Sequence, residues 1–288
     1  MSSLVCTTAM LAVLVAGAAD ARAELLRLHA WPHAVPVVID GAIGEWAGSE
    51  PVVVPLSGEG GADSVELRAA VFDGWIYLAA VWADSTCNEL HKPYRWDPAE
   101  GRYVKTEIME DRFAISFELD GAFTANKIDG SLFSADVWHW KANRTNPVGL
   151  AHDKHWSVTD QPSEAARPFH APDGRTIYLM RPSDDGDQLY KQARPVLRRG
   201  DLEPSYEVNP HAAGSVADVR ARGRCADGRW TLELGRALAT GHPDDVEIPA
   251  SGRLRFAVAV FDGVSFNRVD GGTHSHSEIV ELATGAGV

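Results

Sequence analysis

The stretch Ser134–Asp153, S-A-D-V-W-H-W-K-A-N-R-T-N-P-V-G-L-A-H-D, determines how the rest of the chain is interpreted. Side chains alternate between two faces of an extended strand, so His139 and Lys141 share one face while Trp138 and Trp140 share the other. One face offers two large aromatic rings to a core, and the other carries an imidazole beside an amine. A buried His or Lys without a partner loses its hydration. We therefore predict that this strand is either the floor of a ligand pocket or part of a fully satisfied polar network.

The chain on both sides of this strand consists of alternating apolar runs separated by turn residues. Two of the turns are Asp-Gly pairs, Asp73-Gly74 and Asp227-Gly228, and such pairs between alternating runs are a strong signal for β-hairpins. We expect strands or hairpins over residues 35–40, 64–84, 110–120, 216–238, 253–262 and 278–283. This spacing predicts a mainly β fold, an antiparallel β-sandwich of the immunoglobulin-like kind with long loop insertions.

Two polar segments interrupt these strands. Residues 85–107 are expected to form a long loop, and residues 159–213 are rich in Pro, Asp, Gly and Arg with one short apolar piece at 176–180. A loop that long inside a compact domain is usually functional or mobile. We interpret residues 24–288 as a single domain with a loop-rich insertion at about 159–213, either functional or simply lying over the sandwich.

The first 23 residues have the features of a secretory signal peptide. Their apolar run, Met10–Ala19, is too short to cross a bilayer, and Ala21-Arg22-Ala23 matches an A-x-A cleavage site. No later stretch is long and apolar enough to span a membrane. We therefore expect an exported protein, periplasmic or secreted, with no membrane span.

Charge and cysteine content exclude some classes of partner and cofactor. The chain has 40 Asp and Glu against 27 Lys and Arg, a balance that argues against nucleic acid as a partner. After the signal peptide only Cys87 and Cys225 remain, and an oxidising compartment permits a disulfide between them, although two unpaired thiols are an open alternative. The absence of C-x-x-C-H excludes covalent attachment of a c-type haem through that motif.

The run V-W-H-W-K-A at 137–142, followed by N-R-T-N-P-V-G-L-A-H-D at 143–153, resembles the signature of the haem-binding domain in the ethylbenzene dehydrogenase γ-subunit family. Three shorter segments resemble that family in the same order: I-D-G-A-I-G-E-W-A at 39–47, E-D-R-F-A-I-S-F-E at 110–118, and A-V-F-D-G with T-H-S-H-S-E near the end. The resemblance implies a sandwich related to DOMON and family 9 carbohydrate-binding domains. It also implies a non-covalent haem b at one end of the sandwich, and a redox partner or the catalytic subunit of a molybdenum enzyme.

The residues that could hold this haem can ligate iron, pair with a propionate or stack on the ring. The cofactor-binding candidates are His139, Lys141, Trp138, Trp140, Arg144, Met109 and Lys127, and the metal-ligand candidates are His276, His274 and His139. Relatives place a ligand just before W-H-W-K-A, but here residues 122–133 contain Lys127 alone as a possible ligand, and an amine must lose its proton to bind iron. Either a different ligand pair is used, or this member has lost the haem and kept the pocket.

Each candidate also has a purely structural interpretation. His139 could be hydrogen-bonded to Asp136 or Asp153, and Lys141 could pair with an acid. Met109 and the two tryptophans could be core residues, Arg144 could pin its loop, and His274 with His276 could be an exposed, adventitious metal site.

No catalytic signature such as G-x-S-x-G, H-E-x-x-H, a Walker motif or a Rossmann fingerprint is present in the chain. A non-catalytic subunit is therefore favoured. The family resemblance, together with the His139 and Lys141 strand, implies a periplasmic haem b electron-transfer protein or the small subunit of a molybdenum oxidoreductase. The alternative is a carbohydrate-binding-like module with an aromatic platform drawn from Trp75, Trp82, Trp96 and Trp156. Divalent metal binding by His274 and His276 is a third hypothesis.

Overall fold

The computed structural model describes residues 25–59, 61–263 and 274–285, so the expected signal peptide lies outside the described residues. The regular structure consists of β-strands and three short 3-10 turns. The strands are β1 (Leu26–Pro32), β2 (Val52–Pro55), β3 (Ser57–Glu59), β4 (Ser64–Phe72), β5 (Trp75–Ala83), β6 (Tyr94–Asp97), β7 (Arg102–Lys105), β8 (Arg112–Gly121), β9 (Phe133–Lys141), β10 (His152–Thr159), β11 (Arg167–His170), β12 (Thr176–Met180), β13 (Tyr190–Gln192), β14 (Leu202–Glu203), β15 (Tyr206–Val208), β16 (Arg220–Ala226), β17 (Arg229–Ala237), β18 (Gly252–Phe261), β19 (His274–His276) and β20 (Val280–Thr284). The turns are η1 (Gly44–Gly48), η2 (Asn146–Val148) and η3 (Ser215–Ala217).

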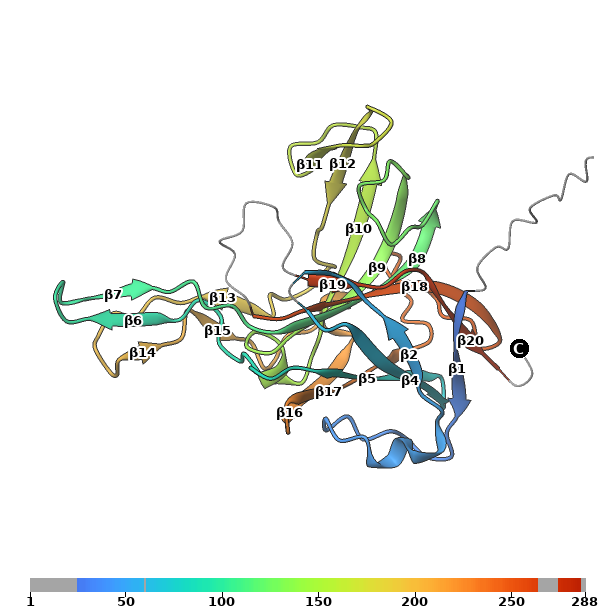
Figure 1. Ribbon diagram of the computed structural model, residues 1–288, viewed down its shortest axis with the longest axis horizontal. Helices are drawn as coiled ribbons and strands as arrows, with labels where there is room; N and C mark the ends of the chain where they lie inside the picture. Colours follow the sequence, from blue (N-terminus) through green and yellow to red (C-terminus); the bar gives the residue numbers. More distant parts are fainter. Residues whose placement is uncertain (1–24, 60, 264–273, 286–288) are drawn as a thin grey trace, which may run out of the picture.

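The strands form a two-layered sandwich. One layer has the order β11-β12-β10-β9-β8-β18-β20, the other has the order β4-β5-β17-β16, and β1 belongs to both (Figure 1). The first half of β1 pairs with β20 and its second half with β4, both in parallel, whereas every other pairing between described strands is antiparallel. The predicted mainly β, antiparallel sandwich is therefore confirmed.

Both Asp-Gly pairs form tight hairpin turns. Asp73 and Gly74 have φ angles of 45° and 77°, and Asp227 and Gly228 have φ angles of 53° and 72°. Positive φ at both central residues is what a type I′ turn requires, and this turn matches the twist of the flanking strands. The turns connect β4 to β5 and β16 to β17 without a register shift, as predicted.

The main core lies between the two layers. Its largest side chains come from alternate positions of β5, β8, β9 and β17, because only one face of each strand turns inward. Trp82, Trp140 and Trp230 pack with ring centroids between 4.9 and 6.2 Å apart. The Cys87–Cys225 disulfide is present, with 6.0 Å between the Cα atoms, and joins the segment after β5 to β16.

Two expectations for the less regular parts of the chain were wrong. Residues 35–40 form no strand, and Val35 and Val38 are exposed because no neighbouring strand pairs with them. Residues 85–107 contain the β6–β7 hairpin, which pairs with β14 and projects at the left of Figure 1. The expected loop-rich region at 159–213 also contains the short strands β11 to β15, of which β11 and β12 extend the first layer at the top of the view. Pairing of β6 with β7 and β14 satisfies backbone groups that the polar composition had assigned to a loop.

Candidate functional site

The predicted alternation along β9 is confirmed. Trp138 and Trp140 are fully buried in the core between the layers, while His139 and Lys141 lie on the outer face of the strand. The two tryptophans therefore do not line the face that carries His139, which corrects their assignment as cofactor-binding residues. They pack the core because their face of β9 turns toward the second layer.

A row of four residues crosses the outer face at the level of His139. His139 of β9 pairs with Ala114 of β8, Ala114 pairs with Ala259 of β18, and Ala259 pairs with His276 of β19. Paired residues of neighbouring strands point to the same face, so the row runs His-Ala-Ala-His. The two alanines between the imidazoles are buried, with 2% of Ala114 and 8% of Ala259 exposed.

Phe261 lies beside this row. Its ring stacks on His139 at 5.8 Å and on His274 at 4.8 Å, measured between ring centroids. The rings of His274 and His276 are 5.9 Å apart, and both residues are half-buried. The structure therefore places His139 on the same face as His274 and His276, which lie far from it in the sequence.

The imidazole of His139 has an unpaired nitrogen. Its Nε2 atom is buried and has no hydrogen-bond partner among the described residues. It is not hydrogen-bonded to Asp136 or Asp153, because both carboxylates point between the layers. Burial, followed by the charges of Lys141 and Arg112, holds the pKa of His139 well below its ordinary value. Burial and Lys127 also lower the pKa of His274 to about 4, so both rings are neutral at neutral pH.

Three cations surround this face without carboxylate partners. The Lys127 ammonium lies 4.1 Å above the ring of Trp156, and the Arg181 guanidinium lies 5.6 Å from the same ring. The Arg112 guanidinium lies 4.3 Å above Phe261. Within the part of the chain that the structure describes, none of the three lies within 4.0 Å of a carboxylate. Burial and Arg181 lower the pKa of Lys127 to about 8. Cations that are partly desolvated and unpaired favour an anionic ligand.

Lys141 belongs to a neighbouring polar network. Its Nζ lies 2.8 Å from His152 Nδ1, and the other ring nitrogen of His152 lies 2.8 Å from Ser183 Oγ. The Tyr190 hydroxyl is 3.4 Å from His152 Nδ1. Lys141 has no acidic partner among the described residues, and burial followed by Arg144 holds its pKa well below the ordinary lysine value. The amine therefore acts as a hydrogen-bond donor to a neutral imidazole rather than as half of an ion pair.

Arg144 is held by the buried carboxylate of Glu110. Its Nε donates to Glu110 Oε1 at 2.5 Å, and the backbone N–H groups of Asn143 and Arg144 donate to the other oxygen. This arrangement pins the loop after β9, which is the structural role considered for Arg144. Met109, the residue before Glu110, is buried, with 5% of its surface exposed.

A second polar assembly, which the sequence reasoning missed, lies between the layers. Arg236 is completely buried, and its Nη1 atom lies 2.7 Å from Asp136, 3.3 Å from Asp153 and 3.3 Å from Asp245. Alternation along β9 alone indicates that Asp136 faces the core. Nothing local in the sequence indicates that Arg236 and Val246, 100 and 110 positions after Asp136, contact its carboxylate.

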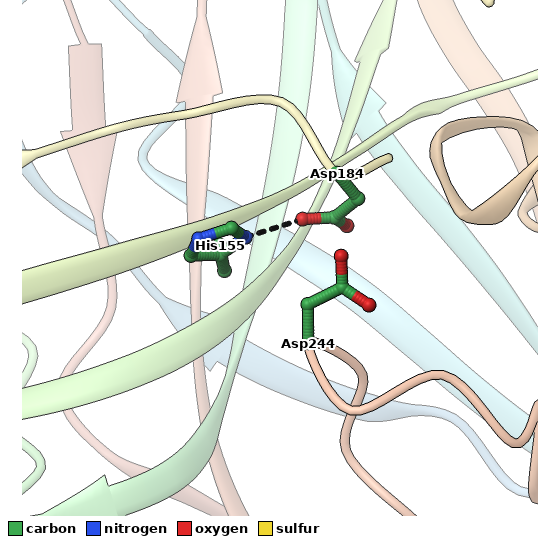
Figure 2. A group of neighbouring side chains, drawn as sticks. All are labelled: His155, Asp184 and Asp244. Atoms are coloured by element: carbon green, nitrogen blue, oxygen red, sulfur yellow. Dashed lines mark hydrogen bonds and ion pairs between the residues drawn. The ribbon is translucent and has the colours of Figure 1, made fainter. Parts of the chain in front are cut away.

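The edge of this assembly carries a further cluster, His155, Asp184 and Asp244 (Figure 2). His155 Nδ1 lies 2.5 Å from Asp184 Oδ1. Burial raises the pKa of Asp184 to about 7, the His155 hydrogen bond opposes that shift, and Asp244 adds to it. The predicted metal ligands His139, His274 and His276 belong to none of the clusters of three potential ligands found among the described residues.

Comparison with known proteins identifies the family of this chain. No helix among the described residues is long and apolar enough to cross a membrane. No curated protein matches the chain. Among solved structures, a family 9 carbohydrate-binding module from Caldicellulosiruptor kristjanssonii in complex with glucose is 10% identical, with 90% of this chain and 95% of that chain covered and a TM-score of 0.40. A family 9 carbohydrate-binding module from Caldicellulosiruptor kristjanssonii in complex with cellotriose is 12% identical, with 90% of this chain and 93% of that chain covered and a TM-score of 0.41. The model of the ethylbenzene dehydrogenase family matches residues 29–272, and the chain therefore belongs to that family.

Proposed function

We propose that the chain is an exported haem b-binding electron-transfer protein that acts alone or as the small subunit of a molybdenum oxidoreductase. The observation that carries the proposal is the buried, unpaired Nε2 of His139 on a face that also presents His274 and His276. An orphaned imidazole nitrogen in a folded protein calls for an explanation, and an iron atom supplies one.

The residues on this face fit a haem in two respects. Iron binds neutral imidazole, and burial keeps His139 and His274 neutral. The unpaired cations Lys127, Arg112 and Arg181 are suited to the two propionates. A bound haem would supply one-electron transfer, and the chain would hold, neutralise and partly desolvate it.

The test is haem reconstitution of the purified mature chain, followed by absorption spectra before and after dithionite reduction. We expect a Soret band distinct from that of free haem, with sharpened bands on reduction. His139→Ala should abolish these bands. His29→Ala, which alters an exposed imidazole on β1, should retain them. Free-haem spectra from the wild-type chain would overturn the proposal, and a wild-type spectrum from His139→Ala would overturn the assignment of this ligand.

The proposed location and partner need separate experiments. Fractionation of the native host should place the mature chain, cleaved after Ala23, in the exported fraction. Purification from that fraction, followed by metal analysis, should show whether molybdenum elutes with the chain. A chain that stays with the cytosolic fraction would contradict the export proposal.

A second candidate function is recognition of a carbohydrate. Trp75 and Tyr77 stack at 6.3 Å and line a pocket of about 300 Å³ together with Arg220, whose guanidinium lies 5.3 Å from the Trp75 ring. Trp82, which was included in the predicted platform, is a core residue and cannot take part. Calorimetric titration with oligosaccharides distinguishes the two candidates: binding that Trp75→Ala abolishes, together with a failed haem reconstitution, would favour this one.

A further inference from the structure

Three segments that are distant in the sequence converge on one cluster of potential metal ligands. His155 comes from β10, Asp184 from the segment after β12, and Asp244 from the segment between β17 and β18 (Figure 2). One nitrogen or oxygen from each residue can be chosen so that the three atoms all lie within 4.8 Å of one another. Such a set can be bridged by a single cation, since ligand atoms around a first-row metal lie about 2.0–2.2 Å from it.

Asp184 supplies the observation that points to a missing ligand. The residue is 5% exposed, and its Oδ1 faces His155, but its Oδ2 is buried without a hydrogen-bond partner among the described residues. Figure 2 shows this second oxygen directed toward the carboxylate of Asp244. Two carboxylates that face each other with nothing between them repel, unless a proton or a cation lies there.

The neighbouring cluster shows how this protein balances such charge elsewhere. Asp136, Asp153 and Asp245 surround the guanidinium of Arg236, which acts as an internal cation. No lysine or arginine lies within 4.0 Å of Asp184 or Asp244 in the described part of the chain. The outer cluster therefore lacks a contacting lysine or arginine such as Arg236, although the charge of Lys154 acts on Asp184 from farther away.

The surrounding backbone holds these ligands in place. Gly186, two residues after Asp184, packs against Gly214, which precedes Ser215. Their φ angles are 139° and 97°, and a Cβ on either glycine would collide with the backbone around the other, so the two backbone segments are in close contact. Ser215 Oγ donates to Asp244 Oδ1 at 3.2 Å, which orients that carboxylate from behind. A pocket of about 240 Å³ next to the cluster is lined in part by Asp184 and Gly186.

We propose that His155, Asp184 and Asp244 form a site for one divalent transition-metal ion, with Zn²⁺ as the best fit. One imidazole and two carboxylates suit a borderline metal better than Ca²⁺ or Mg²⁺, which prefer oxygen ligands alone. Water completes the coordination from the solvent side. The ion fastens β10 to the two segments that follow β12 and β17, and so stabilises the edge of the sandwich independently of the proposed haem face.

The experiment is a calorimetric Zn²⁺ titration of the untagged, chelator-treated chain without haem, paired with thermal unfolding. We expect one Zn²⁺ per chain and a higher melting temperature. His155→Ala and Asp244→Asn should each weaken binding by at least about 10-fold. Two matched controls should bind as the wild type does: His242→Ala, which alters the adjacent His–Asp group, and His274→Ala, which alters the outer face.

Two results would overturn the proposal: a wild-type chain that binds no stoichiometric Zn²⁺, or binding that His274→Ala weakens and His155→Ala does not. Asp244→Asn keeps the test decisive if His155→Ala fails to fold, because Asp244 is half-buried and the amide has the same shape as the carboxylate.

Discussion

Arg236 offers the sharpest test of how the sandwich is held together. The residue is 0% exposed. Its Nη1 forms ion pairs with three carboxylates, and its Nη2 donates a hydrogen bond to the Val246 carbonyl at 2.7 Å. Arg236→Met keeps most of the volume and removes the charge, so Asp136, Asp153 and Asp245 stay buried without a cation. Breaking a buried ion pair from one side costs about 3–5 kcal/mol, and we expect a loss of that size in the free energy of unfolding at neutral pH.

The loss should depend on pH in a known direction. Burial already raises the pKa of Asp136 and Asp153, and Arg236 opposes that shift. Without Arg236 the folded-state pKa values of these carboxyl groups rise further above the unfolded value near 3.8. At a pH between the unfolded and the folded pKa, the folded variant therefore binds more protons than its unfolded chain does. Its stability therefore recovers as the pH falls, and the difference from the wild type is largest under alkaline conditions.

The assay is urea unfolding followed by circular dichroism at pH 8 and pH 5. Arg255→Met is the matched control, because the same substitution there breaks the Arg255–Glu118 pair, whose side chains are 42% and 26% exposed. An ion pair of that kind contributes less than about 1 kcal/mol. If Arg236→Met costs no more than Arg255→Met, or if its effect is the same at both pH values, the account of Arg236 as the internal counter-ion is wrong.

Three further predictions concern the disulfide, a buried histidine and a tight core contact. Replacing Cys87 and Cys225 by Ala should lower the free energy of unfolding, measured in urea, by about 5 kcal/mol, because the bond closes a loop of 138 residues in the unfolded chain. Burial lowers the pKa of His91 from 6.5 to about 3, so the unfolded chain binds an extra proton between those values and stability falls as the pH drops. His91→Gln should remove up to about 1.4 kcal/mol per pH unit from that slope, and an unchanged slope would contradict this. Gly223→Ala should cost about 1–3 kcal/mol in urea unfolding, because its Cβ would lie 2.5 Å from Cζ2 of Trp140.

Local pattern was enough to predict much of the framework. The period of two along β9 assigned Trp138 to the core face and His139 to the opposite one, because side chains of a strand must alternate. The two Asp-Gly turns placed both hairpins, because few other dipeptides accept positive φ at both central positions.

The grouping of functional residues depended on which strands become neighbours. The His-Ala-Ala-His row exists because β8 pairs with β18 and β18 with β19, pairings between segments more than a hundred residues apart in the first case. Arg236 meets Asp136, and Asp184 meets His155, for the same reason. The sequence by itself determined which face each side chain takes, since that depends only on the covalent geometry of a strand. Only the tertiary structure decided which faces meet and which polar atoms remain unpaired, because strand order is set by the packing of the whole core.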